Sequence, residues 1–147
     1  MMAEQVENFI EGLIEKTKEG KLNWRNFLIC SERQSIIQEL ENGRGNIDFM
    51  VNSIRENSSY FLQSHGGYVF LFEIYHGDPS VTSPEMDSLS LMVKINPSLP
   101  LDNLSNFGVE EQQNLETLRI TIEHYIEDKY SYPDVLYKFM SDVLADQ

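Results

Sequence analysis

The sequence predicts a single α+β domain over residues 1–147: a small antiparallel β-meander of three or four strands, packed against helices. Two runs predict the sheet. Residues 68–75 are apolar at nearly every position, as in a strand covered on both faces, whereas residues 89–95 alternate, as in a strand with one covered face. Helical periodicity at both ends of the chain predicts an N-terminal helix and two C-terminal helices packed on the sheet.

The clearest local signal is a β-hairpin. Residues 59–64 and 68–75 have strand composition, and His65-Gly66-Gly67 separates them. Paired glycines permit the positive φ that tight hairpin turns require. A Pro-containing loop over residues 77–88 then leads to the third strand, and residues 22–30 are the candidate for a fourth.

Helical patterns account for most of the remaining chain. The first covers residues 3–19 and ends at Gly20, and the last two cover residues 109–129 and a segment from Ser131 to Leu144. A short helix is expected from Ser31 to Gly43, where Ser31 and Gln34 resemble a capping box. Residues 46–57 fit a helix or a strand, with a slight preference for a helix.

Composition indicates a soluble chain. With 41% hydrophobic residues the chain can build its own core, yet it has no apolar run of the roughly 20 residues that a membrane-spanning helix needs. The N-terminus lacks the features of a secretory signal, and the single cysteine, Cys30, is typical of a reducing compartment. We therefore expect a cytoplasmic protein.

The charge balance narrows the choice of partners. The chain has 24 acidic and 11 basic residues, a net charge of −13. Such a charge repels nucleic-acid phosphates and anionic lipids, so neither direct nucleic-acid binding nor membrane binding is expected. It favours a basic protein partner, although solubility alone is the simpler interpretation.

One loop contains residues that could bind a metal: His76, Asp78, Glu85 and Asp87. Their spacing matches neither a calcium loop nor a zinc motif. A solvated acidic loop is the better interpretation, so no metal and no cofactor are expected.

A nucleophile and base pair could be drawn from Cys30 and His65. That pairing requires both residues to meet and a third group to orient the base, and no pattern in the sequence indicates either. A cysteine preceded by apolar residues is typical of a core, so no catalytic residue is expected.

Aromatic residues near the sheet are the best candidates for contact with a ligand or partner, namely Trp24, Tyr60 and Tyr75. Rings on a sheet can stack on a ligand or simply pack in the core. The ligand interpretation requires a concave pocket beside these rings.

A pattern at the first helix resembles one found in a group of proteins. Thr17, Gly20 and Trp24 form Thr-x-x-Gly-x-x-x-Trp, which is followed by the aromatic strand 68–75 and by Leu115 and Leu118. In this the chain resembles small uncharacterised proteins of Gram-positive bacteria and their mobile elements. It departs from them by extra material between residues 31 and 57 and by a longer Pro-containing loop. The resemblance implies no activity and favours an accessory role.

Three functions follow, in order of preference. The first is a non-catalytic interaction protein with a regulatory, immunity-type or anti-defence role, for which a homodimer is one of the arrangements considered. The second is a protein that binds or sequesters a small ligand at the aromatic residues. The third is a small metal-dependent hydrolase using the loop after residue 75.

Overall fold

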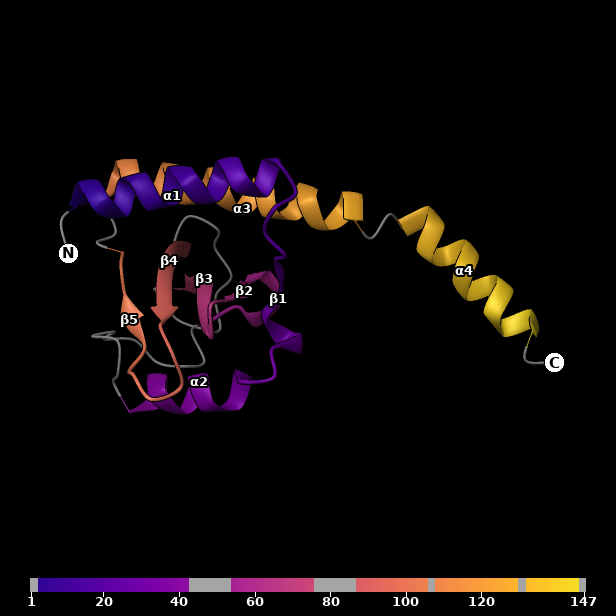
Figure 1. Ribbon diagram of the computed structural model, residues 1–147, viewed down its shortest axis with the longest axis horizontal. Coiled ribbons are helices and arrows are strands. Elements are labelled where there is room, and N and C mark those ends of the chain that lie inside the picture. Colours follow the sequence, from indigo (N-terminus) through magenta and orange to yellow (C-terminus); the bar gives the residue numbers. More distant parts are fainter. Residues whose placement is uncertain (1–2, 43–53, 76–86, 106–107, 130–131, 146–147) are drawn as a thin grey trace.

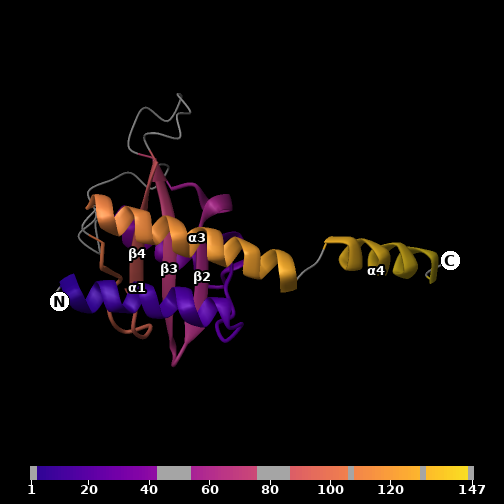
Figure 2. The ribbon, with the colours of Figure 1, turned by 90° about the horizontal axis from the view of Figure 1, so that it is seen from above.

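The computed structural model describes residues 3–42, 54–75, 87–105, 108–129 and 132–145, and all of these ranges except the last form three layers (Figure 1). Helices α1 (Ala3–Lys18) and α3 (Val109–Lys129) lie side by side on one face of an antiparallel sheet (Figure 2). Helix α2 (Arg33–Glu41) lies on the opposite face. This arrangement confirms the predicted α+β class.

Within the described ranges the sheet has five strands, in the order β1-β2-β3-β4-β5. Their bounds are β1 Arg25–Asn26, β2 Tyr60–Ser64, β3 Gly67–Tyr75, β4 Asp87–Lys94 and β5 Asp102–Asn103. Because each strand pairs with its successor in the chain, the sheet is the predicted meander. β1 is shorter than the candidate segment 22–30, since the 3-10 helix η1 (Phe27–Ile29) follows it directly. β5 has two residues and therefore shows no alternation that the sequence could reveal.

The predicted hairpin joins β2 to β3. Ser64 pairs with Gly67, which leaves a two-residue turn of His65 and Gly66 with φ values of 52° and 79°. Positive φ at both positions is typical of a type I′ turn. Gly67, by contrast, is extended, and a Cβ atom there would lie 2.4 Å from the carbonyl oxygens of Lys94 and Ile95. The second glycine is therefore needed for close approach of two strands and not for turn geometry.

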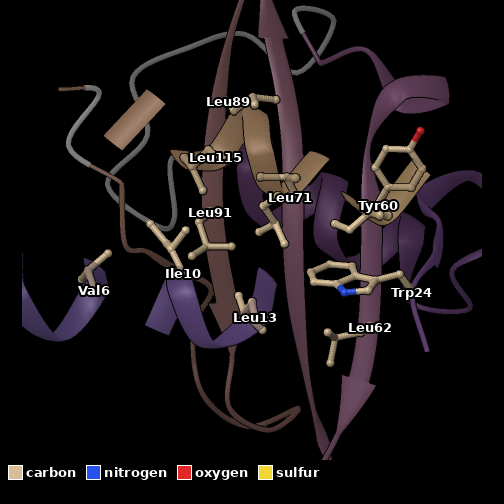
Figure 3. Packing of buried hydrophobic residues seen from close by; sticks show 12 residues of the cluster. Val6, Ile10, Leu13, Trp24, Tyr60, Leu62, Leu71, Leu89, Leu91 and Leu115 are labelled. Carbon is tan, nitrogen blue, oxygen red and sulfur yellow. The ribbon is translucent and has the colours of Figure 1, made fainter. Parts of the chain in front are cut away.

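Both faces of β3 are buried, as its apolar run predicts. Leu71 belongs to the cluster beneath α1 and α3, together with Ile10 and Leu115 (Figure 3). On the other face, Phe70 and Phe72 pack with Phe27 of η1 at ring-centroid distances of 5.9 and 5.0 Å, in the cluster that α2 covers.

The prediction of one covered face for β4 is wrong. Ser90 and Lys94 alternate with the apolar residues of β4, yet both are buried. Their polar atoms have partners: Ser90 Oγ donates to Asn103 Oδ1 at 3.1 Å, and Lys94 Nζ donates to the Leu99 carbonyl at 2.7 Å and pairs with Glu39 of α2. Polar side chains with such partners can be buried without a large penalty.

Helix α4 (Tyr132–Ala145) does not lie on the sheet, where both C-terminal helices were expected. It extends away from the three layers beyond the end of α3 (Figures 1 and 2). A proline at position 133 cannot continue the hydrogen-bond ladder of α3, so α4 starts as a separate helix past the edge of the sheet.

Of two further local predictions, one is wrong and the other can be assessed only in part. The N-cap of α2 is Glu32 and makes no side-chain capping bond, so the capping box at Ser31 is wrong. Of residues 46–57, only 54–57 lie within the described ranges. There Ile54 forms an antiparallel bridge with Ile74, and a 3-10 turn follows at Glu56–Ser58.

Candidate functional site

A cleft of about 620 Å³ opens at the β1 edge of the sheet, between β1, η1 and the C-terminal half of α3. Its apolar walls come from Trp24, Ile29, Tyr60 and Ile126. Polar side chains also line it, namely Arg25, Asn26, Glu123 and Glu127. An apolar concavity with a few polar groups is the usual form of a binding site.

Trp24 forms part of the wall of the cleft, and a hydrogen bond to α1 holds its ring in place. It is fully buried, and its Nε1 donates to Thr17 Oγ1 at 2.9 Å, while that hydroxyl donates to the Leu13 carbonyl at 2.6 Å. Helix α1 ends at Lys18, and Gly20 follows in the terminating turn with a φ of 73°, where Gly20 N donates to Thr17 O and Lys21 N donates to Lys16 O. This Schellman-type ending turns the chain so that Trp24 meets Thr17.

Tyr60 stands next to Trp24 at the β2 edge of the cluster (Figure 3). Its hydroxyl oxygen lies 3.5 Å from Glu123 Oε1, an oxygen that also accepts a 2.7 Å hydrogen bond from Arg119 Nη1. Burial, followed by the nearby Glu123 carboxylate, raises the pKa of the Tyr60 hydroxyl to about 12. The phenol is therefore neutral at physiological pH and can act as a hydrogen-bond donor.

The mouth of the cleft combines charge with exposed apolar surface. Ile29 is 55% exposed, and Arg25 and Glu127 are exposed beside it. Two carboxylates and one guanidinium give the lining a small negative excess. An occupant with an apolar body and a polar or cationic edge fits this lining best.

Tyr75 lies outside this cleft. Its ring is buried, and the Arg55 guanidinium carbon lies 4.9 Å from the ring centroid, in a cation–π contact. The structure thus brings two of the three sequence candidates, Trp24 and Tyr60, to one cleft and leaves Tyr75 elsewhere.

The structure does not bring Cys30 and His65 together. Cys30 follows η1, whose Phe27 N donates to Ser59 O just before β2, whereas His65 follows the last residue of β2 and places Nδ1 2.7 Å from Ser64 Oγ. Burial raises the pKa of the Cys30 thiol, which opposes formation of a nucleophilic thiolate.

The metal candidates cannot be assembled into a site from the described part of the chain. His76, Asp78 and Glu85 lie outside the described residues, and Asp87 is the first residue of β4. Elsewhere in the described ranges no group of three or more His, Cys, Asp or Glu side chains is placed to hold a metal ion.

A second candidate surface is the apolar side of α4. Every side chain from Leu136 to Ala145 is exposed. The large apolar side chains among them are between 38% and 72% exposed; they are Leu136, Tyr137, Phe139, Met140, Val143 and Leu144. On a helical projection they fall on one side, and the polar residues Lys138, Ser141 and Asp142 fall on the other. An exposed apolar face of this extent is typical of interaction sites.

Sequence reasoning missed most of the cleft lining. The four-residue spacing of Glu123 and Glu127 places both carboxylates on one side of α3 and is visible in the sequence. Their position opposite β1 is not, because about 100 residues separate the two segments.

Comparison of the chain with protein-family models, with curated proteins and with solved structures gave no match. Among helices in the described ranges, none combines the length and apolarity needed to cross a membrane.

Proposed function

We propose that this protein is a non-catalytic interaction protein that binds another protein through α4. The observation that carries the proposal is the exposed apolar face of this helix. An amphipathic helix that lays residues at positions i, i+3, i+4 and i+7 into a groove is a common recognition mode, and Leu136, Phe139, Met140 and Val143 have this spacing. Regulatory, immunity-type or anti-defence roles all use such binding.

The charge of the body favours a basic partner. The net charge of the chain is −13. Along the outer side of α1 four glutamates are exposed: Glu4, Glu7, Glu11 and Glu15. Such a surface accelerates encounter with a positively charged protein and disfavours acidic ones. In this proposal α4 supplies the affinity and the acidic body selects the partner.

The test is a capture experiment with the full chain as bait, in wild type, Phe139→Ser and Ser141→Gln forms. The first substitution removes a central apolar side chain of α4, and the second changes its polar side. Because both side chains are exposed, neither substitution should alter folding. Wild type and Ser141→Gln should retain the same basic protein, less strongly at high salt, while Phe139→Ser should lose it. Equal capture by all three forms, or no capture at low salt, contradicts the proposal.

The cleft supports a second candidate function, binding of a small organic cation. Ile29 and Ile126 supply accessible apolar surface, with the buried rings of Trp24 and Tyr60 behind it, and Glu123 and Glu127 supply negative charge. Trp24 is the one tryptophan of the chain, so its fluorescence reports directly on the cleft. Titration with phenethylamine as a probe should change this fluorescence in the wild type and not in a Glu127→Gln variant. An unchanged signal in the wild type argues against this candidate.

A further inference from the structure

One surface of this chain is convex and another is concave. The apolar side of α4 is convex and exposed, and the cleft between η1 and α3 is concave and partly apolar. Both lie at the same end of the molecule, because the cleft extends to Glu127 and α3 ends at Lys129, three residues before α4 begins. In the structure α4 points away from the body and so does not fill the cleft of its own chain (Figures 1 and 2).

We infer that α4 of one copy occupies the cleft of a second copy, in a twofold-symmetric dimer that exchanges the two helices. This inference rests on the proposed role of α4 as a binding helix, and it goes beyond the proposed function because it names a second, acidic copy of the chain rather than a basic protein as the partner of that helix. Exchange of an identical element is an established route to a symmetric dimer.

Interface area favours exchange in both directions. A stable interface buries about 800 Å² on each partner. One 14-residue helix laid on one cleft supplies only part of this area. In a reciprocal exchange each chain contributes both its α4 and its cleft, and because the two lie at the same end the two contacts adjoin. The buried area is then twice that of a single contact.

Charge also favours contact through α4 rather than through α1 or α3. Two chains that each carry a net charge of −13 repel each other. Only two of the 24 acidic residues, Asp134 and Asp142, lie in α4, and Lys138 partly offsets them. α4 therefore lets two copies meet through one of their least acidic elements. Because added salt screens the remaining repulsion, this dimer should tighten as salt rises, whereas binding to a basic partner should weaken.

The decisive experiment measures the molar mass of the full chain in solution, by light scattering or sedimentation over a range of concentrations. Wild type should have twice the mass of one chain. Phe139→Ser in α4 and Ile29→Glu at the mouth of the cleft should each weaken the dimer at least tenfold. Ile95→Glu is a matched control for the cleft variant, since Ile95 is also exposed but does not line the cleft, and Ser141→Gln is the control for α4. Both controls should stay dimeric.

Mixing the two weakened variants tests the exchange itself. Phe139→Ser keeps an intact cleft and Ile29→Glu keeps an intact α4, so a mixed dimer contains one complete contact. The mixture should therefore dimerise more tightly than either variant alone. Failure of this rescue overturns the exchange.

Other results identify other occupants and also overturn it. A dimer unaffected by Ile29→Glu indicates that the α4 helices pack on each other, and a monomeric wild type indicates that α4 folds back or awaits another protein. A monomer that still captures a basic partner through α4 contradicts the exchange but leaves the proposed function intact. A dimer that captures no basic protein supports the exchange and contradicts the proposed function.

Discussion

Trp24 Nε1 donates a 2.9 Å hydrogen bond to Thr17 Oγ1, and this contact joins the end of α1 to the start of the sheet. Thr17 and Trp24 are the first and last residues of the Thr-x-x-Gly-x-x-x-Trp pattern, and Gly20 between them takes the positive φ that ends the helix. The pattern thus has a structural explanation: it fixes the wall of the cleft.

Loss of this hydrogen bond should destabilise the protein. Thr17→Val keeps the shape of the side chain but leaves the buried indole N–H without an acceptor, so the free energy of unfolding should fall by about 1–3 kcal/mol. Thr17→Ser retains the hydroxyl and should remain closer to wild type. Urea unfolding followed by Trp24 fluorescence measures both. A Thr17→Val variant as stable as wild type would show that the bond contributes nothing.

Two glycines of the first helical region should respond in opposite ways to alanine. Gly20 has a φ of 73°, so Gly20→Ala should destabilise by about 1 kcal/mol through backbone strain alone, since a Cβ atom there meets nothing within 4 Å. Gly12 lies inside α1, where a Cβ atom also meets nothing. Gly12→Ala should therefore stabilise by about 0.5–1 kcal/mol. Thermal or urea unfolding gives both values, and effects of the same sign would refute the explanation.

The ion pair between Lys94 and Glu39 should matter far more than exposed pairs do. Their side chains are only 10% and 18% exposed, and Glu39 Oε2 also accepts from Leu101 N at 2.9 Å. Lys94→Met leaves the carboxylate buried without its counter-ion, which should destabilise by about 3 kcal/mol or more. Adding Glu39→Gln to the Lys94→Met variant removes the negative charge of that carboxylate. The double variant should therefore recover part of the lost stability.

The exposed pair of Lys21 with Glu19, at 2.9 Å, provides the control. Lys21→Met should leave the free energy of unfolding almost unchanged, because solvent screens this pair. If Lys94→Met and Lys21→Met had equal effects in urea unfolding, burial of the first pair would not be the cause of its importance.

Tyr60 should make the stability depend on alkaline pH. Its pKa is raised from 10.0 to about 12 in the folded protein, chiefly by burial. The unfolded chain therefore releases this proton first, so the contribution of Tyr60 to stability is complete below about pH 10 and is lost as the pH rises towards 12. The measurement compares the unfolding free energies of wild type and Tyr60→Phe at several pH values. The stability advantage of wild type should shrink as the pH rises through this window. A difference that stays constant would rule out the raised pKa.

Patterns along the chain were sufficient to predict the long helices and the three longest strands, but not β5 or the short extent of β1. Apolar spacing predicted α1 and α3, the apolar run predicted β3 with two covered faces, and the glycine pair predicted the hairpin. These features depend on neighbours in sequence, because helix and strand geometry repeat every few residues. The ring candidates Trp24 and Tyr60 were also visible, since both lie in segments with strand composition.

Only the tertiary structure decided where these elements face. It buried Lys94 and Ser90, which look solvent-facing in the alternation of β4, because Glu39 and Asn103 come from other segments to meet them. It placed β1 opposite Glu123 to form the cleft, and it left the apolar side of α4 uncovered although its periodicity resembles that of a core helix. An apolar pattern records that a face is to be covered, whereas the surface that covers it is set by contacts between distant residues, or between chains.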